Sequence, residues 1–212
     1  NYSFFFTDQS ELNITNKEDV KTYIIQNNIK IVINCAAYTN VDESEDNEEM
    51  AYSVNFLAVK NIISVLEKIN GKLIHISTDY VFDGSSNKPY SELDKVSPAS
   101  VYGISKHKGE LEIINSSIQS IIIRTSWLYS SYGNNFVKKI ISLSKQKNEI
   151  DIVSDQLGSP TYAEDLANVC LEIIKKSVEI FQNGNILYHY SNEGICSWYD
   201  FARAIFELKG IE

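Results

Sequence analysis

Short apolar segments alternate along this chain with longer amphipathic ones. Three apolar segments have the length and β-branched content of buried strands: Ile29–Asn34, Lys72–Ser77 and Ser120–Arg124. Three intervening segments repeat apolar residues at helical spacing: 17–27, 48–69 and 97–114. In the third, Ser97 is the expected N-cap and Pro98 the first helical residue. The alternation predicts an α/β fold with a Rossmann-like, doubly wound parallel sheet.

The two ends of the chain are less regular. Residues 1–8 read as a strand already under way, and we expect a segment to be missing before it. After Trp127 the pattern predicts further elements: helices near 136–146, 163–177 and 198–208, and strands near 150–153 and 186–190. We therefore expect a Rossmann-like domain over 1–126 and, over 127–212, mainly a smaller lobe, with 150–177 returning to pack on the first sheet.

Composition narrows the class of function. The 212 residues are 43% hydrophobic and 22% charged, as expected of a globular chain with a real core. The 28 acidic against 19 basic residues give a net charge of −9, which disfavours binding to nucleic acid or anionic membranes. No apolar run is long enough to cross a membrane. We expect a soluble, cytoplasmic protein, either a monomer or a homodimer.

Metal and disulfide chemistry are not indicated. The three cysteines, Cys35, Cys170 and Cys196, lie far apart without metal-ligand spacing. Residues 42–49 hold six carboxylates among eight residues, which is typical of a solvated helix start. His75, on a predicted strand, reads as an interior residue rather than a catalyst. No metal site is predicted.

Candidate chemistry begins with Tyr102 and Lys106, four residues apart and therefore on one face of a helix. A nearby ammonium favours tyrosinate, so we expect Lys106 to lower the pKa of Tyr102 toward the range useful for proton transfer. The same spacing arises often by chance on solvated helices. Thr78, at the carboxyl end of a strand one crossover earlier, is expected at the same sheet edge, where its hydroxyl could share a substrate oxygen with Tyr102.

With these residues in place, the chain resembles the extended short-chain dehydrogenase/reductases, and within them the dTDP-4-dehydrorhamnose reductases. The resemblance covers essentially the whole chain. It is carried by seven ordered segments: Val32–Asp42, Ser77–Gly84, Val101–Glu110, Arg124–Tyr129, Gly133–Phe136, Asp155–Thr161 and Trp198–Ala202.

The resemblance implies reduction of the C4 ketone of dTDP-4-dehydro-6-deoxy-L-mannose to dTDP-L-rhamnose, with hydride from NADPH or NADH. It implies catalytic roles for Tyr102 as general acid, for Lys106 as the residue that binds the nicotinamide ribose and tunes the tyrosine, and for Thr78 as the third member. Further residues match cofactor-lining positions: Asn13, Ile14, Ala37, Tyr38 and Thr39. Others match positions around the sugar: Asp79, Tyr80, Trp127 and Asn135. The smaller lobe would then bind the substrate.

Two departures and one open choice accompany the resemblance. Family members often have Asp where this chain has Asn13. The resemblance also implies that the first βα unit of the fold, with the family's Gly-rich cofactor loop, is absent from this chain, so we expect weak cofactor binding by this chain alone. Some members bind Mg²⁺ between subunits, and Glu164 matches one ligand position, but no metal is predicted on that basis. The choice of NADPH or NADH is open, although Asp8 would slightly favour NADH.

Alternative functions remain at this stage. Dehydratases of the superfamily carry an Asp-Glu pair after the threonine and epimerases a small residue, whereas this chain has Asp79-Tyr80, which favours simple reduction. Another sugar-nucleotide reductase or epimerase is nevertheless still open. The regulatory subunit of methionine adenosyltransferase, which acts mainly by binding a partner enzyme, also resembles these reductases. The block Arg124–Trp127 speaks against it.

Overall fold

A computed structural model of the chain describes residues 2–211. The chain folds into two compact units. The first comprises residues up to Arg124 together with Lys176–His189, and the second comprises Thr125–Lys175 and residues from Tyr190 onward. Residues 176–189 thus belong with the first unit, whereas the sequence-based boundary at 126 assigned them mainly to the second. No helix among the described residues is long and apolar enough to cross a membrane.

The first unit is built on a four-stranded sheet in the order β1-β2-β3-β7. Its strands are β1 (Ile31–Asn34), β2 (Lys72–Thr78), β3 (Gln119–Thr125) and β7 (Asn185–His189). Both β1 with β2 and β3 with β7 pair in parallel. The predicted parallel α/β sheet is confirmed.

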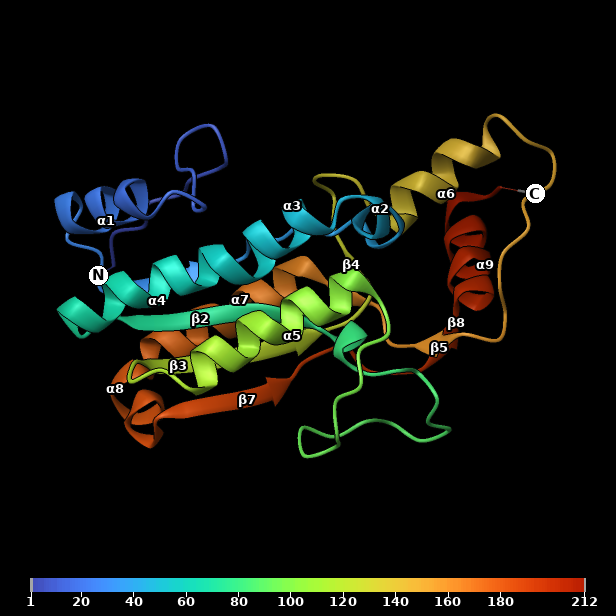
Figure 1. Ribbon diagram of the computed structural model, residues 1–212. Helices are drawn as coiled ribbons and strands as arrows, with labels where there is room; N and C mark the ends of the chain where they lie inside the picture. The colour runs from blue at the N-terminus through green and yellow to red at the C-terminus, as the bar shows by residue number, and fades with distance from the viewer. Residues whose placement is uncertain (1, 212) are drawn as a thin grey trace. The chain divides into compact units, whose positions relative to one another are not determined.

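Helices of the first unit connect these strands. They are α1 (Lys17–Gln26), α2 (Val41–Asp46), α3 (Glu48–Tyr52), α4 (Ala58–Ile69), α5 (Val101–Ile114) and α8 (Ser177–Ile180), with a π-helical turn η1 (Ser53–Leu57) and 3₁₀ turns η2 (Asp79–Val81) and η3 (Phe181–Asn183). The long helix predicted over 48–69 is present as α3, η1 and α4 in succession. Figure 1 shows α4 and α5 lying side by side along β2.

One face of this sheet changes character along the strands. Alternate residues of a strand share a face, so Leu73, His75 and Ser77 of β2 point the same way. Leu73 lies in the core cluster with α1, α4 and α5 residues, whereas Ser77 bonds to Glu110 of α5. The amino-terminal half of this face is therefore the apolar core, and the carboxyl-terminal half is polar.

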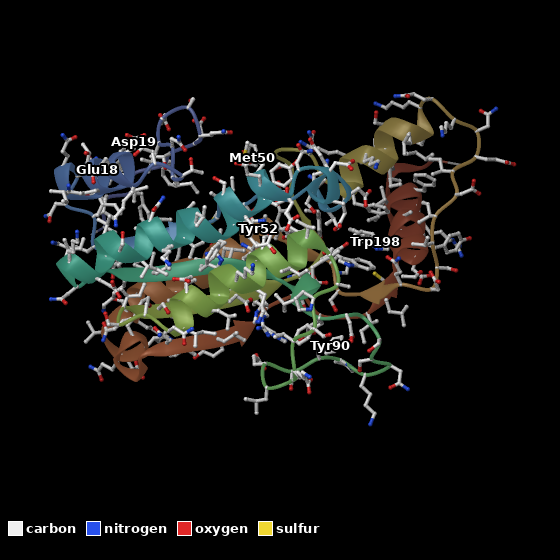
Figure 2. The ribbon with its side chains drawn as sticks, in the orientation of Figure 1. Glu18, Asp19, Met50, Tyr52, Tyr90 and Trp198 are labelled. Carbon is white, nitrogen blue, oxygen red and sulfur yellow. The ribbon has the colours of Figure 1, made fainter. Side chains whose placement is uncertain are left out.

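The helices α3 and α5 also contact each other through a cation and an aromatic ring. The Nζ of Lys108 in α5 lies 4.3 Å from the ring centroid of Tyr52 in α3, which is labelled in Figure 2.

Among its described residues, the second unit contains two small sheets and three helices. In it, β4 (Leu128–Tyr129) pairs in parallel with β6 (Thr161–Tyr162), and β5 (Leu157–Gly158) pairs antiparallel with β8 (Cys196–Ser197). The helices are α6 (Phe136–Ser144), α7 (Ala163–Lys175) and α9 (Trp198–Lys209). Trp198, labelled in Figure 2 at the start of α9, stacks on Trp127 with ring centroids 3.6 Å apart.

Three local predictions were wrong. Residues 2–8 pair with no other described segment and form no strand. Asn1, the first residue of that prediction, lies outside the described residues. The helix expected from Ser97 begins at Val101: Ser97 donates its N–H to the Val81 carbonyl oxygen, and Ser100 is the N-cap instead. The strand expected near 150–153 is absent, since the Val153 carbonyl accepts from the N–H of Tyr199 in α9.

Candidate functional site

The first turns of α5 carry Tyr102 and Lys106 into the polar half of the sheet face. The Ser100 hydroxyl caps the helix by accepting the Gly103 N–H at 3.1 Å, and Glu45 accepts the N–H of Val101 at 2.8 Å. Gly103 allows the helix to approach closely, because a Cβ there would collide with the carbonyl oxygen of Tyr80. Tyr102 is consequently held directly beside the strand end that carries Thr78 and Tyr80.

Tyr102 is buried, with 8% of its surface exposed. Burial raises the pKa of its phenol to about 12, against the effect of a hydrogen bond with Thr78, which lowers that pKa. Its ring also makes an edge contact with Tyr80, with centroids 5.5 Å apart. The expected lowering of the Tyr102 pKa by Lys106 was wrong for this structure: burial and the nearby Asp79 and Tyr80 raise that pKa, only the hydrogen bond with Thr78 lowers it, and Lys106 is not among the groups that shift it.

Lys106 is almost completely buried, with 1% exposed. Its Nζ donates to the Ile76 carbonyl oxygen at 2.7 Å and lies 3.3 Å from Nε2 of His75. Burial lowers the pKa of the Lys106 amine to about 8, and the negative charges of Glu110 and Cys35 partly oppose that shift. The Lys106 ammonium is therefore removed from water without a carboxylate from the described residues placed close to it.

Thr78 and Asp79 form the strand-to-helix junction beside Tyr102. The Thr78 hydroxyl oxygen accepts the Tyr80 N–H at 3.2 Å and donates to Asp79 Oδ1 at 3.2 Å. Burial raises the pKa of the Asp79 carboxyl to about 6, although the hydrogen bond from Thr78 lowers it. Thr78, Tyr102 and Lys106 are thus brought together at one sheet edge, with Asp79 and Tyr80 next to them.

Two buried polar residues in this region were not found from the sequence. Asn55, in the π-helical turn, accepts the Tyr38 N–H at 2.9 Å and donates to the Tyr38 carbonyl at 3.1 Å and to Ser105 Oγ at 3.0 Å. Asn34, at the end of β1, lies 3.1 Å from His75 Nδ1 through its amide nitrogen. In the sequence, the only signal for either residue is that a polar side chain interrupts a segment that is otherwise apolar. Short π-helical turns occur frequently at functional sites.

The candidate cofactor residues fall into two groups. Ala37, Tyr38 and Thr39 follow β1, and Asn55 links Tyr38 to α5. Asn13 is exposed and accepts hydrogen bonds from Thr15, through its N–H at 3.1 Å and its hydroxyl at 2.7 Å. Ile14 packs against the apolar core cluster. The structure therefore ties the first group to the catalytic helix and, of the second group, Ile14 to the apolar core.

Trp127 and Asn135 belong to the second unit. Trp127 has a φ of +48°, a left-handed conformation rare for a bulky residue, and such strain is found at ligand sites more often than elsewhere. The Asn135 side chain accepts the Lys138 N–H at 3.2 Å and donates to the Ser130 carbonyl at 2.8 Å, so it caps α6. Asn135 also lines an open hollow of about 660 Å³ along α6. Its substrate contact remains a prediction.

No group of three or more His, Cys, Asp or Glu residues within 2–211 is arranged to hold a metal ion. Glu164 accepts a hydrogen bond from the Tyr162 hydroxyl at 3.1 Å. The donor set of the first unit instead consists of a phenol, an ammonium and a threonine hydroxyl, which are groups suited to polarising a carbonyl oxygen.

Comparison with known proteins identifies the relatives of this chain. The family model described as the RmlD substrate binding domain matches residues 1–212. A dTDP-4-dehydrorhamnose reductase of Aggregatibacter actinomycetemcomitans is 43% identical over 97% of this chain and 70% of its own length. The spore coat polysaccharide biosynthesis protein SpsK of Bacillus subtilis (strain 168) is 41% identical over 95% of this chain and 69% of its own length.

Solved structures agree with these relatives. The crystal structure of dTDP-4-dehydrorhamnose reductase from Bacillus anthracis str. Ames, in complex with NADP, matches with a TM-score of 0.92 at 39% identity, over 100% of this chain and 73% of that one. This match confirms the predicted Rossmann-like fold class. The chain therefore belongs to the dTDP-4-dehydrorhamnose reductase family.

Proposed function

We propose that this chain carries the catalytic residues of an NAD(P)H-dependent dTDP-4-dehydrorhamnose reductase, which reduces the C4 ketone of dTDP-4-dehydro-6-deoxy-L-mannose to dTDP-L-rhamnose. Family membership supports the reaction. The observation that carries the residue assignment is the meeting of Thr78, Tyr102 and Lys106 at the carboxyl edge of β2. Ligands of open parallel sheets bind at this edge.

Tyr102 is the general acid in this proposal. Because burial raises its pKa to about 12, the phenol stays protonated across the neutral range. Reduction of a ketone requires a proton for the oxygen as hydride reaches the carbon, and only a protonated phenol can supply it. Tyr102 is therefore in the form that the reductive direction uses, and because a pKa of about 12 makes the phenol a weak acid, its anion must be stabilised as the proton leaves.

Lys106 and Thr78 support this proton transfer. The Lys106 ammonium stabilises the tyrosinate that remains after the proton has left, because opposite charges attract strongly in a buried site. In this proposal the Thr78 hydroxyl turns its proton from Asp79 to the ketone oxygen when substrate binds, and so orients that oxygen toward the phenol. Each of the three residues thus acts on the same substrate oxygen or on its proton donor.

The residues fit a nicotinamide cofactor. Lys106 has three N–H donors, and its one short hydrogen bond is to the Ile76 carbonyl, so donors remain for the hydroxyl groups of a ribose. A reduced nicotinamide would supply the hydride. Ala37, Tyr38 and Thr39 lie on the segment that follows β1, which Asn55 holds to α5, and we assign cofactor contacts to them and, at the adenine end, to Asn13 and Ile14.

NADPH is the form of cofactor that we propose. The Bacillus anthracis relative is described in complex with NADP. Asp8, which as a free carboxylate would repel a 2′-phosphate, uses Oδ1 to accept the Ser10 N–H at 2.7 Å and the Ser10 hydroxyl at 2.6 Å. These hydrogen bonds lower the pKa of Asp8 and keep the carboxylate charged, so Asp8 does not itself favour NADPH, and the proposal of NADPH rests on the relative.

Each unit carries residues that match sugar-contacting positions of the family. Asp79 and Tyr80 adjoin Tyr102 in the first unit, and the strained Trp127 and the α6 cap Asn135 belong to the second. We propose that the first unit binds the dinucleotide and that the second contributes mainly to the nucleotide sugar. A cytoplasmic location is part of the same proposal.

The test uses the full-length protein, as wild type and as Tyr102→Phe, with the dTDP-4-dehydro sugar and with NADPH or NADH. Oxidation of the cofactor is followed by nicotinamide absorbance. We expect turnover to be faster with NADPH and to fall by about 10²–10⁴-fold in Tyr102→Phe, because the general acid is lost. Undiminished turnover in the variant would contradict the role of Tyr102. A folded, cofactor-binding protein without turnover would favour the regulatory-subunit alternative.

A further inference from the structure

Three buried polar side chains form a line from β1 through β2 to α5. Asn34 and His75 are direct partners in the β1–β2 register, and Lys106 reaches them from α5. Their exposed fractions are 4%, 0% and 1%, respectively. Burying polar groups is costly unless they are hydrogen-bonded, so the orientation of each group in the line is constrained by its neighbours. The proton transfer from Tyr102 does not itself require Asn34 or His75.

The Asn34 amide is oriented by the backbone. The Ala36 N–H donates to Asn34 Oδ1 at 3.2 Å, so this oxygen faces away from the histidine. The Asn34 amide nitrogen, which can only donate, then lies 3.1 Å from His75 Nδ1. Rotating the amide by half a turn would place two donors against each other at Ala36. His75 Nδ1 is therefore an acceptor without a proton.

The ring of His75 is neutral. Burial lowers the pKa of His75 well below its usual value, the charge of Lys106 lowers it further, and Glu110 opposes both. A neutral imidazole carries one N–H. Since Nδ1 accepts from Asn34, the proton is on Nε2, which lies 3.3 Å from Lys106 Nζ.

We propose that His75 is a positioning residue for Lys106: Asn34 selects the ring tautomer that presents Nε2–H, rather than a bare nitrogen, to the lysine amine. This contact favours the neutral amine, which accepts the N–H, over the ammonium, which repels it. The Ile76 carbonyl accepts from either form. Lys106 Nζ thus lies between the His75 Nε2–H, a donor, and the Ile76 carbonyl oxygen, an acceptor. Neither the ammonium nor the neutral amine is strongly favoured by these two contacts.

Other groups act on the same amine. Glu110 on α5 and Cys35 after β1 favour the ammonium, whereas burial opposes it. The Asn34–His75 pair adds a hydrogen-bond donor, the His75 Nε2–H, that faces the Lys106 amine and favours its neutral form. Desolvation alone provides no such oriented contact. The role of Lys106 in turnover rests on the proposed reductase function, but the tautomer of His75 does not.

The tautomer is measured directly by two-bond ¹H–¹⁵N correlation NMR on the full-length protein labelled with ¹⁵N-histidine. The His75 ring is assigned by the loss of its signals in His75→Gln and by their persistence in His107→Gln and His189→Gln. We expect a protonated Nε2 and a bare Nδ1 that do not change between about pH 6 and 8, as for a buried neutral ring. A proton on Nδ1, or an imidazolium, would overturn the inference whether or not the protein turns over substrate.

Asn34→Asp tests the effect on Lys106. The carboxylate would accept Nδ1–H, move the ring proton to Nδ1 and turn a bare Nε2 toward the lysine. The alkaline limb of kcat/KM, where Lys106 loses its proton, should then move to higher pH by about one unit or more, because a favourable hydrogen bond replaces an unfavourable contact and the new carboxylate also favours the ammonium. Asn47→Asp, which adds the same charge on the exposed segment between α2 and α3, should leave the limb in place.

The outcomes separate the two proposals. Absence of turnover in the wild type with the expected tautomer would count against the reductase function alone. Normal turnover with an unmoved limb in Asn34→Asp would overturn the action of His75 on Lys106. Should Asn34→Asp not fold, the wild-type tautomer still decides whether the selection by Asn34 exists.

Discussion

Lys106 and Glu110 lie one turn apart on α5, and both are buried, yet the structure treats their charges differently. Glu110 accepts two hydrogen bonds from Arg124, at 2.9 and 2.7 Å, and one from the Ser77 hydroxyl at 2.5 Å. Lys106 has no carboxylate within ion-pair distance among the described residues. Its contacts are one carbonyl and one histidine ring.

The pKa values follow from these partners. Burial raises the pKa of Glu110, but hydrogen bonds from Arg124, His107 and Ser77 and the charge of Arg124 more than reverse this, to about 2. Burial lowers the pKa of Lys106 to about 8, with little compensation. A fully compensated buried charge stabilises the fold, whereas an under-compensated one remains available for chemistry. The comparison therefore separates the structural from the catalytic end of α5.

The largest effect is expected for Glu110→Gln. Arg124 would remain buried without a counter-charge, so the free energy of unfolding should fall by about 3–5 kcal/mol. Glu112→Gln is the matched control on the same helix, because Glu112 is partly exposed and its oxygen lies 3.6 Å from Lys60. That change should cost less than about 1 kcal/mol. Urea denaturation measures both, and equal losses would contradict the structural role of Glu110.

The pH dependence of stability sharpens the comparison at Lys106. Its pKa is about 8 in the folded chain against 10.5 for an ordinary lysine, so between these values the unfolded state binds more protons. Stability from this group should rise with pH across that window, by on the order of 3 kcal/mol when complete. The rise should be absent in Lys106→Met and retained in Lys108→Met, an exposed lysine on the same helix.

The measurement is urea denaturation at pH values from about 8 to 9.5, below the range in which tyrosines titrate. Glu110 has a dependence of the same sign in an acidic window. Its folded pKa is depressed to about 2 from 4.5, so its stabilisation is present above about pH 4.5 and is lost as pH falls toward 2. A Lys106→Met protein that kept the alkaline rise would show that Lys106 is not its source.

A smaller effect is expected from Gly103→Ala. The new Cβ would collide with the Tyr80 carbonyl and lie 3.2 Å from the Pro98 Cβ, so the start of α5 must move, at about 1–3 kcal/mol. Gly109→Ala is the comparison, because its Cβ would collide with the Asn55 carbonyl on the same helix. Both should lose stability, but kcat should fall more in Gly103→Ala, which displaces Tyr102. Equal kcat values at equal stability would contradict this positioning.

Much of the site was predictable because strand ends and helix spacing are local signals. Thr78 was expected at a strand end, and Tyr102 and Lys106 on the following helix, and the structure places all three at that edge. The start of α5 was misplaced because Ser97-Pro98 and Ser100 are both acceptable N-cap sequences, and only tertiary contacts choose between them. The same limit applies to Ile150–Val153, whose apolar pattern has no strand partner.

The polar line through Asn34 and His75 could not be found in the same way. Asn34 is the last residue of β1 and His75 lies in the middle of β2, and His75 was correctly expected to be interior. Their contact depends on the β1–β2 register, which pairs Asn34 with His75. Register is set by long-range pairing rather than by local propensity. The direction of the Tyr102 pKa shift was predicted wrongly for a related reason, since desolvation depends on how the whole chain packs around the phenol.

The division of α5 is tested most directly by the turnover of Lys106→Met in the full-length protein at neutral pH, with NADPH and the dTDP-4-dehydro sugar. Lys106 is proposed to stabilise the Tyr102 anion during catalysis but not to stabilise the fold. We therefore predict a loss of turnover of about 10²-fold or more in a protein whose unfolding free energy is unchanged or higher. Turnover equal to that of the wild type in the folded variant would contradict the account.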